Sequence, residues 1–234
     1  MCGIAGFVDE IGDGEKLLAT MLNAIAHRGP DACKTYIHEN IHLGHNRLSI
    51  IDLSANANQP MHDNGLTIVY NGEIYNYIEI RTELEKSGEV FKTKSDTEVI
   101  LKAYQRWGEK CVEYFVGMWA FALWDQHENK LFCSRDRFGI KPFYYINSNN
   151  KFYFGSEFKA LKPTPVFSNE INQYQVLRGL QMGWICYEDE TYFDVIKALP
   201  AAHNLVFYRD KAEIKIFRYW SLQTGVYSNK SFDE

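Results

Sequence analysis

The chain has 234 residues, 46% of them hydrophobic and 15% aromatic, which is enough apolar surface for one large core. A net charge of −5 and a pI of about 5.8 argue against nucleic acid or an anionic membrane surface as a partner. We find neither a secretory leader nor an apolar run long enough to span a membrane, so we expect a cytoplasmic protein.

The first third of the chain predicts strands that alternate with helices. Apolar residues at 4–8 predict a strand, and apolar residues at helical spacing over 17–25 predict a helix. This helix should end before His27-Arg28-Gly29-Pro30-Asp31, because proline disfavours helical backbone in the residue before it. Further strands are predicted near 34–37, 42–46 and 66–70.

Two helices are predicted in the middle of the chain. Tyr77, Ile80 and Leu84 follow helical spacing and are closed by Gly88. A second helix is expected to start at the Ser-x-x-Glu pattern of 95–98, which is typical of a capping box, and to continue to Gly108.

The second half of the chain consists mainly of short apolar or alternating segments separated by polar turns. This pattern is typical of antiparallel hairpins, which we expect at 118–124 with 130–134, 142–146 with 151–154, and 204–208 with 213–217. The order of elements predicts a single α+β domain with mainly antiparallel sheets.

Cys2 follows the initiator methionine directly and admits two interpretations. The structural one is a small buried residue that opens the first strand. The chemical one is that removal of Met1 leaves a residue with both a thiol nucleophile and an α-amine base. The five cysteines contain no CxxC pair, which disfavours a disulfide framework or a zinc site and suits a reducing compartment.

Asn71-Gly72 in Tyr70-Asn71-Gly72-Glu73 is a second candidate site. Asn-Gly after a strand usually forms a hairpin turn, but the residues from 76 onward have helical periodicity. We therefore expect a strand-to-helix corner, where the Gly72 amide and the Asn71 side chain point outward. Two such donors are what an oxyanion hole requires.

Several charged residues have both a structural and a functional interpretation. Arg47 could be a surface or ion-paired arginine, or a fork that binds a carboxylate. Asp96 in the first turn of a helix complements the helix dipole or binds a ligand. We expect His27, Arg28 and Asp31 to form a turn, and 135–142 to be a salt-bridged hairpin corner rather than an anion site. No phosphate-binding loop is found, so nucleotide chemistry is not expected.

Taken together, these motifs resemble the class II glutamine amidotransferase domain, and within that class the N-terminal half of glutamine-hydrolysing asparagine synthetases. The resemblance covers about residues 2–222. It rests on these stretches, in this order: Cys2-Gly3-Ile4-Ala5-Gly6, residues 27–31, residues 47–52, residues 70–76, residues 95–98, residues 135–142, residues 154–157 and Arg218-Tyr219-Trp220.

The resemblance implies an N-terminal-nucleophile hydrolase fold, a four-layer αββα sandwich with two mainly antiparallel sheets. It also implies a domain at 2–222, and we interpret 223–234 as a tail that begins a missing synthetase domain. An excised domain is our first interpretation, and a natural single domain is the alternative.

The resemblance assigns a role to each site residue. Cys2 would be the nucleophile with its α-amine as base, and Asn71 and Gly72 would form the oxyanion hole. Arg47 would bind the α-carboxylate of L-glutamine, Glu73 and Asp96 its α-amino group. The loop Leu48, Ser49, Ile50 and Ile51 would line the carboxylate side. A free α-amine with a pKa of about 7.7–8.0 suits the role of base near neutral pH.

The resemblance therefore predicts hydrolysis of L-glutamine to L-glutamate and ammonia through a cysteinyl thioester, with the ammonia used for asparagine synthesis. We expect no metal and no cofactor in this chain, with ATP and magnesium serving only the synthetase domain. The partners expected are L-glutamine and that ATP-dependent domain, and a homodimer stays open. Alternatives are an N-terminal-cysteine amidohydrolase for another amide, or a non-catalytic regulatory module of the same fold.

Overall fold

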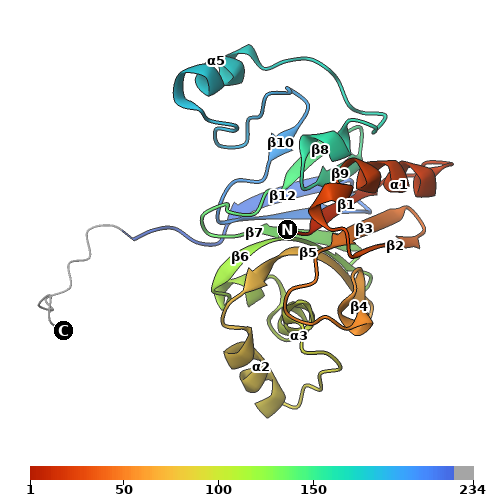
Figure 1. Cartoon of the computed structure of the whole chain (residues 1–234), viewed down its shortest axis with the longest axis vertical. Helices are drawn as coiled ribbons and strands as arrows, with labels where there is room; N and C mark the ends of the chain where they lie inside the picture. The colour runs from red at the N-terminus through yellow and green to blue at the C-terminus, as the bar shows by residue number, and fades with distance from the viewer. Residues whose placement is uncertain (224–234) are drawn as a thin grey trace, which may run out of the picture.

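The computed structural model describes residues 1–223, so the expected tail, apart from Gln223, lies outside the described residues. Within the described residues two six-stranded sheets stack face to face, and helices cover both outer faces (Figure 1). The expected four-layer αββα sandwich is therefore confirmed. Among residues 1–223, no helix combines the length and the apolar character needed to cross a membrane.

The first sheet carries the N-terminal strand near its centre and pairs its strands antiparallel in the order β10-β8-β9-β1-β3-β2. Its strands are β1 Gly3–Val8, β2 Ala32–His38, β3 Ile41–Arg47, β8 Tyr144–Ser148, β9 Lys151–Gly155 and β10 Lys197–Ala198.

The second sheet is also antiparallel, with the order β12-β11-β7-β6-β5-β4. Its strands are β4 Met61–Asp63, β5 Leu66–Ile74, β6 Gly117–Asp125, β7 Lys130–Arg135, β11 His203–Tyr208 and β12 Glu213–Arg218. The three expected hairpins, β6-β7, β8-β9 and β11-β12, are confirmed.

The outer layers are helical. α1 and α4 pack on the first sheet, and α2 and α3 pack on the second (Figure 1). The helices are α1 Gly14–Ala24, α2 Tyr77–Lys86, α3 Asp96–Trp107, α4 Phe158–Leu161 and α5 Gln173–Met182, with short 3-10 helices η1 Ala26–Arg28, η2 Ala55–Ala57 and η3 Gly108–Glu113. The expected helices correspond to α1, α2 and α3, and α1 ends before the proline motif as predicted.

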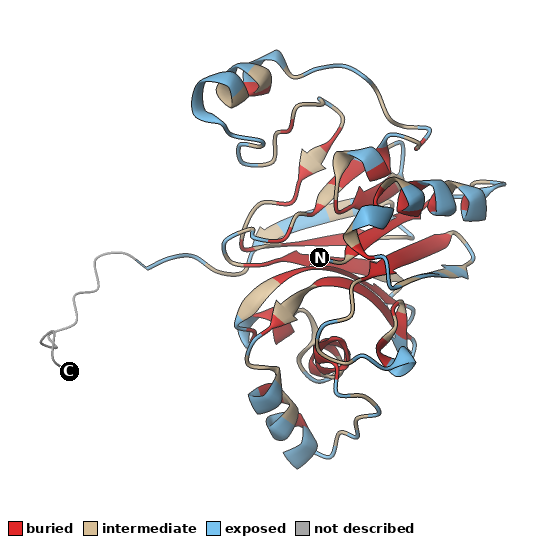
Figure 2. Cartoon of the chain, viewed as in Figure 1, coloured by how far each residue is buried: buried red, intermediate tan, exposed pale blue. Residues whose placement is uncertain are grey.

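Three layers of apolar side chains hold these elements together. The central strands that contribute to them are buried along most of their length (Figure 2). The layer between the sheets joins Ile4 and Leu43 to Val69 and Trp124, all at most 1% exposed. Two further layers join each sheet to its helices. Because the strands of both sheets are buried on two faces, they read as nearly continuous apolar runs in the sequence.

The expected strand-to-helix corner at Asn71-Gly72 is wrong. β5 continues to Ile74, and Asn71 and Gly72 pair with Ala120 and Trp119 of β6. Gly72 has a packing reason, since a Cβ there would lie 2.3 Å from the Met118 carbonyl oxygen. The Asn-Gly pair therefore marks a close approach of two strands rather than a turn.

The capping box at the start of α3 is only half present. The Ser95 hydroxyl accepts a hydrogen bond from the Thr97 amide at 3.1 Å, as an N-cap should. Glu98, however, accepts bonds from the Lys92 and Thr93 amides at 2.7 and 2.6 Å instead of reaching back to Ser95. Its carboxylate holds the loop before the helix.

The charged corner at 135–142 is not salt-bridged, contrary to expectation. Among the described residues, no ion pair includes Arg135 or Asp136; both side chains bind backbone groups instead. The Asp136 carboxylate accepts from the amides of Trp119, Phe138, Ile140 and Lys141 at 2.9–3.2 Å. Arg135 donates to the carbonyl oxygens of Gly139, Lys141 and Leu199.

Candidate active site

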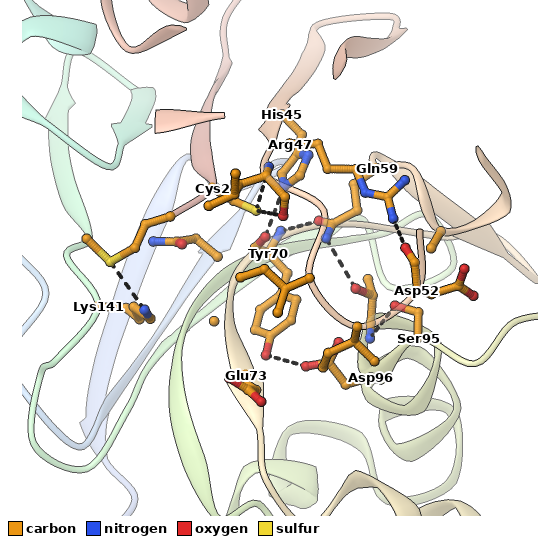
Figure 3. Close-up of a pocket in the computed structure, with 18 of the residues that line it drawn as sticks. Cys2, His45, Arg47, Asp52, Gln59, Tyr70, Glu73, Ser95, Asp96 and Lys141 are labelled. Atoms are coloured by element: carbon orange, nitrogen blue, oxygen red, sulfur yellow. Dashed lines mark hydrogen bonds between the residues drawn. The ribbon is translucent and has the colours of Figure 1, made fainter. Parts of the chain in front are cut away.

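A small cavity of about 80 Å³, lined by both polar and apolar groups, lies beneath the N-terminus, where the two sheets and α3 meet (Figure 3). Ten of the nineteen residues that line it were not among the candidates from the sequence. The candidates that line it are Cys2, Arg47, Leu48, Ile50, Ile51, Asn71, Gly72, Glu73 and Asp96. Ser49 is not among the described lining residues, because its amide turns away to the Asp31 carboxylate at 2.7 Å.

Cys2 presents its thiol to the cavity from the start of β1. The Sγ atom lies 3.4 Å from the Leu48 amide and 3.5 Å from the Leu48 carbonyl oxygen, so it can accept from one and donate to the other. Burial raises the pKa of this thiol, while the Leu48 amide and the nearby positive charges of the N-terminus and Arg47 lower it. The net rise favours the protonated thiol, and a base is needed to activate it.

The loop 27–31 holds the backbone on either side of this thiol. Arg28 Nε donates to the Cys2 carbonyl oxygen at 2.9 Å, and its Nη1 pairs with Glu157 at the same distance. Asp31 anchors the neighbouring loop through the Ser49 amide. The turn predicted from the sequence thus also positions the nucleophile, a role that the sequence analysis did not assign.

The side chain of Asn71 points toward the first sheet, at the end where Cys2 precedes β1. Alternate residues of a strand face opposite sides, and Val69 of β5 packs in the layer between the sheets, so Asn71 and Glu73 share that side. Asn71 is 1% exposed, yet its Nδ2 atom has no hydrogen-bond partner in the described structure. A buried amide without a partner is costly, which indicates a donor held ready for a ligand.

The backbone amide of Gly72 lies on the open edge of β5. Tyr70 and Ile74 donate their amides away from β6, to Gln59 Oε1 at 2.6 Å and to Asp96 Oδ2 at 3.1 Å. Successive amides of a strand alternate between its two edges, so the Gly72 amide faces the same edge as these two. Asn71 and Gly72 can therefore supply two donors to one oxyanion.

Asp96 lies opposite, in the first turn of α3, and is tied to β5. Tyr70 faces α3 rather than the first sheet, and its hydroxyl donates to Asp96 Oδ2 at 2.7 Å. Burial raises the pKa of the Asp96 carboxyl, and the Tyr70 hydroxyl and the Ile74 amide oppose this rise. The result is a buried acceptor that gains from a cationic ligand.

Arg47 ends β3 and combines both interpretations given to it from the sequence. Its Nη1 donates to the Ser54 carbonyl oxygen at 2.8 Å and to Asn58 Oδ1 at 2.7 Å, and its Nη2 donates to the Asp52 carbonyl oxygen. These bonds hold the loop 52–58 over the cavity. A guanidinium has five N–H donors, so two are left for a carboxylate.

His45, Gln59, Tyr70 and Lys141 line the cavity, although sequence reasoning did not select them. His45 is 1% exposed, and burial lowers its pKa to about 3, so the imidazole is neutral. Its Nε2 therefore donates to the Tyr70 carbonyl oxygen at 3.1 Å. The Gly-His-Asn-Arg context of His45 in a strand gives no signal of this contact, whereas Tyr70 is the first residue of the stretch 70–76 that carries the resemblance.

Comparison with known proteins agrees with this geometry. Residues 1–220 match the family described as "Glutamine amidotransferase domain". The protein named "Asparagine synthetase [glutamine-hydrolyzing] 3" from Bacillus subtilis is 35% identical over 241 aligned residues, covering 100% of this chain and 39% of the relative. The protein named "Amidase chry2" from Gibberella zeae is 33% identical, covering 95% of this chain and 35% of the relative.

Among solved structures, the glutamine phosphoribosylpyrophosphate amidotransferase from B. subtilis superimposes with a TM-score of 0.70 at 17% identity. The match covers 94% of this chain and 49% of that one. At this identity the likeness concerns the fold alone. The chain spans less than half the length of each of these three proteins.

Proposed function

This chain belongs to the family of glutamine amidotransferase domains, and from that premise we propose that it hydrolyses L-glutamine at Cys2. The proposal requires that Met1 be removed, because the α-amine of Cys2 is then the base. His45 is too weak a base for this role, because burial lowers its pKa to about 3 and its Nε2 binds the Tyr70 carbonyl oxygen. Among the described residues, no carboxylate is hydrogen-bonded to Cys2 Sγ, whose contacts are to the Leu48 backbone. The α-amine belongs to the same residue as the thiol, so the base and the nucleophile are held together by the backbone of Cys2.

The chemistry would proceed in two halves. The amine accepts the thiol proton, and the thiolate attacks the γ-amide carbon to give a tetrahedral oxyanion bound by Asn71 Nδ2 and the Gly72 amide. The resulting ammonium group of Cys2 returns its proton to the amide nitrogen of the substrate. The C–N bond then breaks, ammonia departs, and a γ-glutamyl thioester remains on Cys2. Water, deprotonated by the amine, then attacks the thioester, and glutamate leaves as the thiol is restored.

We propose that the rest of the cavity recognises the zwitterionic end of glutamine. The two remaining Arg47 donors would bind the α-carboxylate, and Asp96 with Glu73 would bind the α-ammonium group. Arg47 lies at the loop 52–58 and Asp96 at the first turn of α3, on two different walls of the cavity. One cation and two anions on separate walls suit an α-amino acid better than an unsubstituted amide.

The observation that carries this proposal is the unpartnered Asn71 Nδ2 in the cavity that a half-buried Cys2 also lines. A direct test uses 6-diazo-5-oxo-L-norleucine, a glutamine analogue that alkylates an activated nucleophile. Peptide mass spectrometry should find one label, on Cys2, and L-glutamine should protect against it. The exposed Cys33 serves as an internal control, since a merely accessible thiol would be labelled there as well.

We further propose that the ammonia serves asparagine synthesis. The support is that the B. subtilis relative is named as an asparagine synthetase and that this chain covers only 39% of it. The ATP-dependent step and its magnesium are proposed for a synthetase domain, not for the described cavity.

The redox state of the cysteines bears on location. Five free cysteines, Cys2, Cys33, Cys111, Cys133 and Cys186, support a cytoplasmic location.

A second candidate function is hydrolysis of another amide, which the fungal relative named as an amidase brings into consideration. It would use the same Cys2 chemistry with a different substrate end. Comparing kcat/KM for L-glutamine with that for 4-aminobutanamide, which lacks the α-carboxylate, separates the two. Preference for the smaller amide would favour the second candidate.

A further inference from the structure

Lys141 is a buried cation at the N-terminus that the proposed reaction does not use. It lies in the loop between β7 and β8, is 5% exposed with Met1 in place, and lines the same cavity as Cys2 (Figure 3). Its Nζ atom lies 3.3 Å from the sulfur of Met1, the residue whose removal the proposed function requires.

The backbone of Lys141 is fixed from both sides. Its amide donates to Asp136 Oδ2 at 2.9 Å, and its carbonyl oxygen accepts from Arg135 Nε at 2.8 Å. The corner at 135–142 thus holds this one side chain toward the N-terminal residue.

The charge of Lys141 has no carboxylate partner among residues 1–223. Asp136, which lies nearest along the chain, is occupied by four backbone amides. Of the other charged groups around the N-terminus, Arg28 pairs with Glu157 and Arg47 binds the loop 52–58. Glu73 lines the same cavity and acts on Lys141 through its charge, but it forms no ion pair with it in the described structure. An unpaired buried ammonium is costly to keep, which indicates a use for its charge.

We propose that Lys141 is a positioning residue, whose buried and unpaired ammonium keeps the α-amine of processed Cys2 in its neutral, basic form. This inference rests on the proposed function, since it assigns a purpose to that amine. A like charge close by disfavours a second positive charge, so the amine stays free to accept the thiol proton near neutral pH. The pKa of Lys141 is itself lowered, chiefly by burial and then by Arg28, while Asp136, Cys2 and Glu73 oppose the decrease.

The other groups that face the N-terminal residue act on the same amine from each neighbouring element. The cations are Arg28 from η1 and Arg47 from β3; the anions are Glu73 from β5 and Asp96 from α3; the neutral groups are His45 from β3 and the Cys2 thiol. Lys141 is coupled through its charge to Arg28, Asp136, Cys2 and Glu73, so a variant that keeps the charge is needed beside one that removes it.

The test compares Lys141→Met, which removes the charge but keeps the length, with Lys141→Arg, which keeps the charge. Lys94→Met, at an exposed position, is the control for a change in net charge. Loss of Met1 is verified by mass in every sample. Lys141→Met should shift the acidic limb of the pH profile of glutamine hydrolysis upward by roughly one pH unit, with the rates converging above about pH 9. Lys141→Arg and Lys94→Met should keep the wild-type limb.

A second readout does not depend on turnover. In a Cys2→Ser background, competitive acylation with acetic anhydride over a range of pH reports the pKa of the α-amine. Lys141→Met should raise this pKa by roughly one unit relative to Lys141 in the same background. An unchanged amine pKa would overturn the inference, whether or not the chain hydrolyses glutamine. A raised pKa in a chain that fails to hydrolyse glutamine would support the charge effect and contradict the proposed function instead.

Discussion

The Tyr70 hydroxyl donates a hydrogen bond to the Asp96 carboxylate at 2.7 Å and thereby joins β5 to the first turn of α3. The residue that carries the hydroxyl also begins the stretch with the two proposed oxyanion donors. The site for the α-ammonium group and the site for the oxyanion therefore share one strand. A substitution at Tyr70 should therefore weaken the binding of the substrate without altering the contacts of the Cys2 thiol.

Tyr70→Phe should raise KM for glutamine about tenfold and leave kcat within about threefold, since hydrogen bonds to charged groups contribute about 1.5–3 kcal/mol. Because the Tyr70 hydroxyl lowers the pKa of Asp96, its loss lets burial raise that pKa further. The rise in KM should then grow as the pH falls, since a protonated Asp96 no longer pairs with the substrate ammonium. Kinetics at several pH values measure this.

Tyr104→Phe is the matched control, because its hydroxyl also donates to a carboxylate, Asp125, at 3.1 Å but lies outside the cavity. Equal KM values in the two variants would show that Tyr70 has no special part in binding glutamine.

Asn71→Ala should lower kcat about 10²–10³-fold with little change in KM, as the loss of one oxyanion donor generally does. Nδ2 of Asn71 makes no described hydrogen bond in the free protein, so the fold should lose little by the substitution. Steady-state kinetics and a thermal melt together test both statements. Asn76→Ala, at a half-exposed position before α2, provides the comparison. A variant with normal kcat would remove Asn71 from the oxyanion hole.

Arg47→Ala should act on both substrate capture and the loop 52–58. The loss of a charge-assisted contact predicts a decrease in kcat/KM of roughly 10- to 150-fold for L-glutamine. The loss of three bonds to the loop predicts a lower free energy of unfolding, by about 1–3 kcal/mol. For 4-aminobutanamide, which has no α-carboxylate, kcat/KM should change much less. The same factor for both substrates would mean that Arg47 acts only through the loop.

His45 predicts a dependence of stability on pH. Its pKa is about 3 in the folded protein, against about 6.5 for an unperturbed histidine, so below pH 6.5 the unfolded chain binds a proton that the folded chain does not. This stability is present above about pH 6.5 and is lost as the pH falls toward 3. The free energy of unfolding should decrease by up to about 1.4 kcal/mol per pH unit through this residue.

Urea unfolding of wild type and His45→Gln between pH 7 and pH 4 isolates that contribution, because the carboxyl groups are common to both. The dependence should be shallower in the variant. Parallel curves would show that His45 titrates alike in both states.

The sandwich was largely predictable from the sequence, because the apolar pattern of each strand and the turn residues beside it indicate the same local structure. The hairpins at β6-β7 and β11-β12 combine apolar strands with short polar turns, so their pairing needs no distant information. α5 was not predicted, because most of its apolar side chains, such as Leu180 at 83% exposed, face away from the core and leave a weak pattern. Gly72 misled the prediction, because close strand packing and a turn both require glycine at that position.

The site was predictable where a motif carries it and not where distant segments meet. Cys2, Arg47, Asn71 and Asp96 stand in recognisable stretches, and all line one cavity. Lys141 reaches the same cavity only because the corner 135–142 folds back over the N-terminus, 140 residues away in the sequence. Ser49 illustrates the converse, since it lies inside a recognised motif but turns its amide to Asp31.

The proposed mechanism depends most on the free α-amine of Cys2. The measurement is the release of glutamate and ammonium from L-glutamine alone by two preparations whose N-termini have been sequenced, one beginning at Cys2 and one with an uncleaved N-terminal tag. The processed chain should release glutamate and ammonium in equal amounts without ATP. It should form no asparagine when ATP and aspartate are added. The tagged chain should be inactive. Full turnover by the tagged chain would contradict the mechanism.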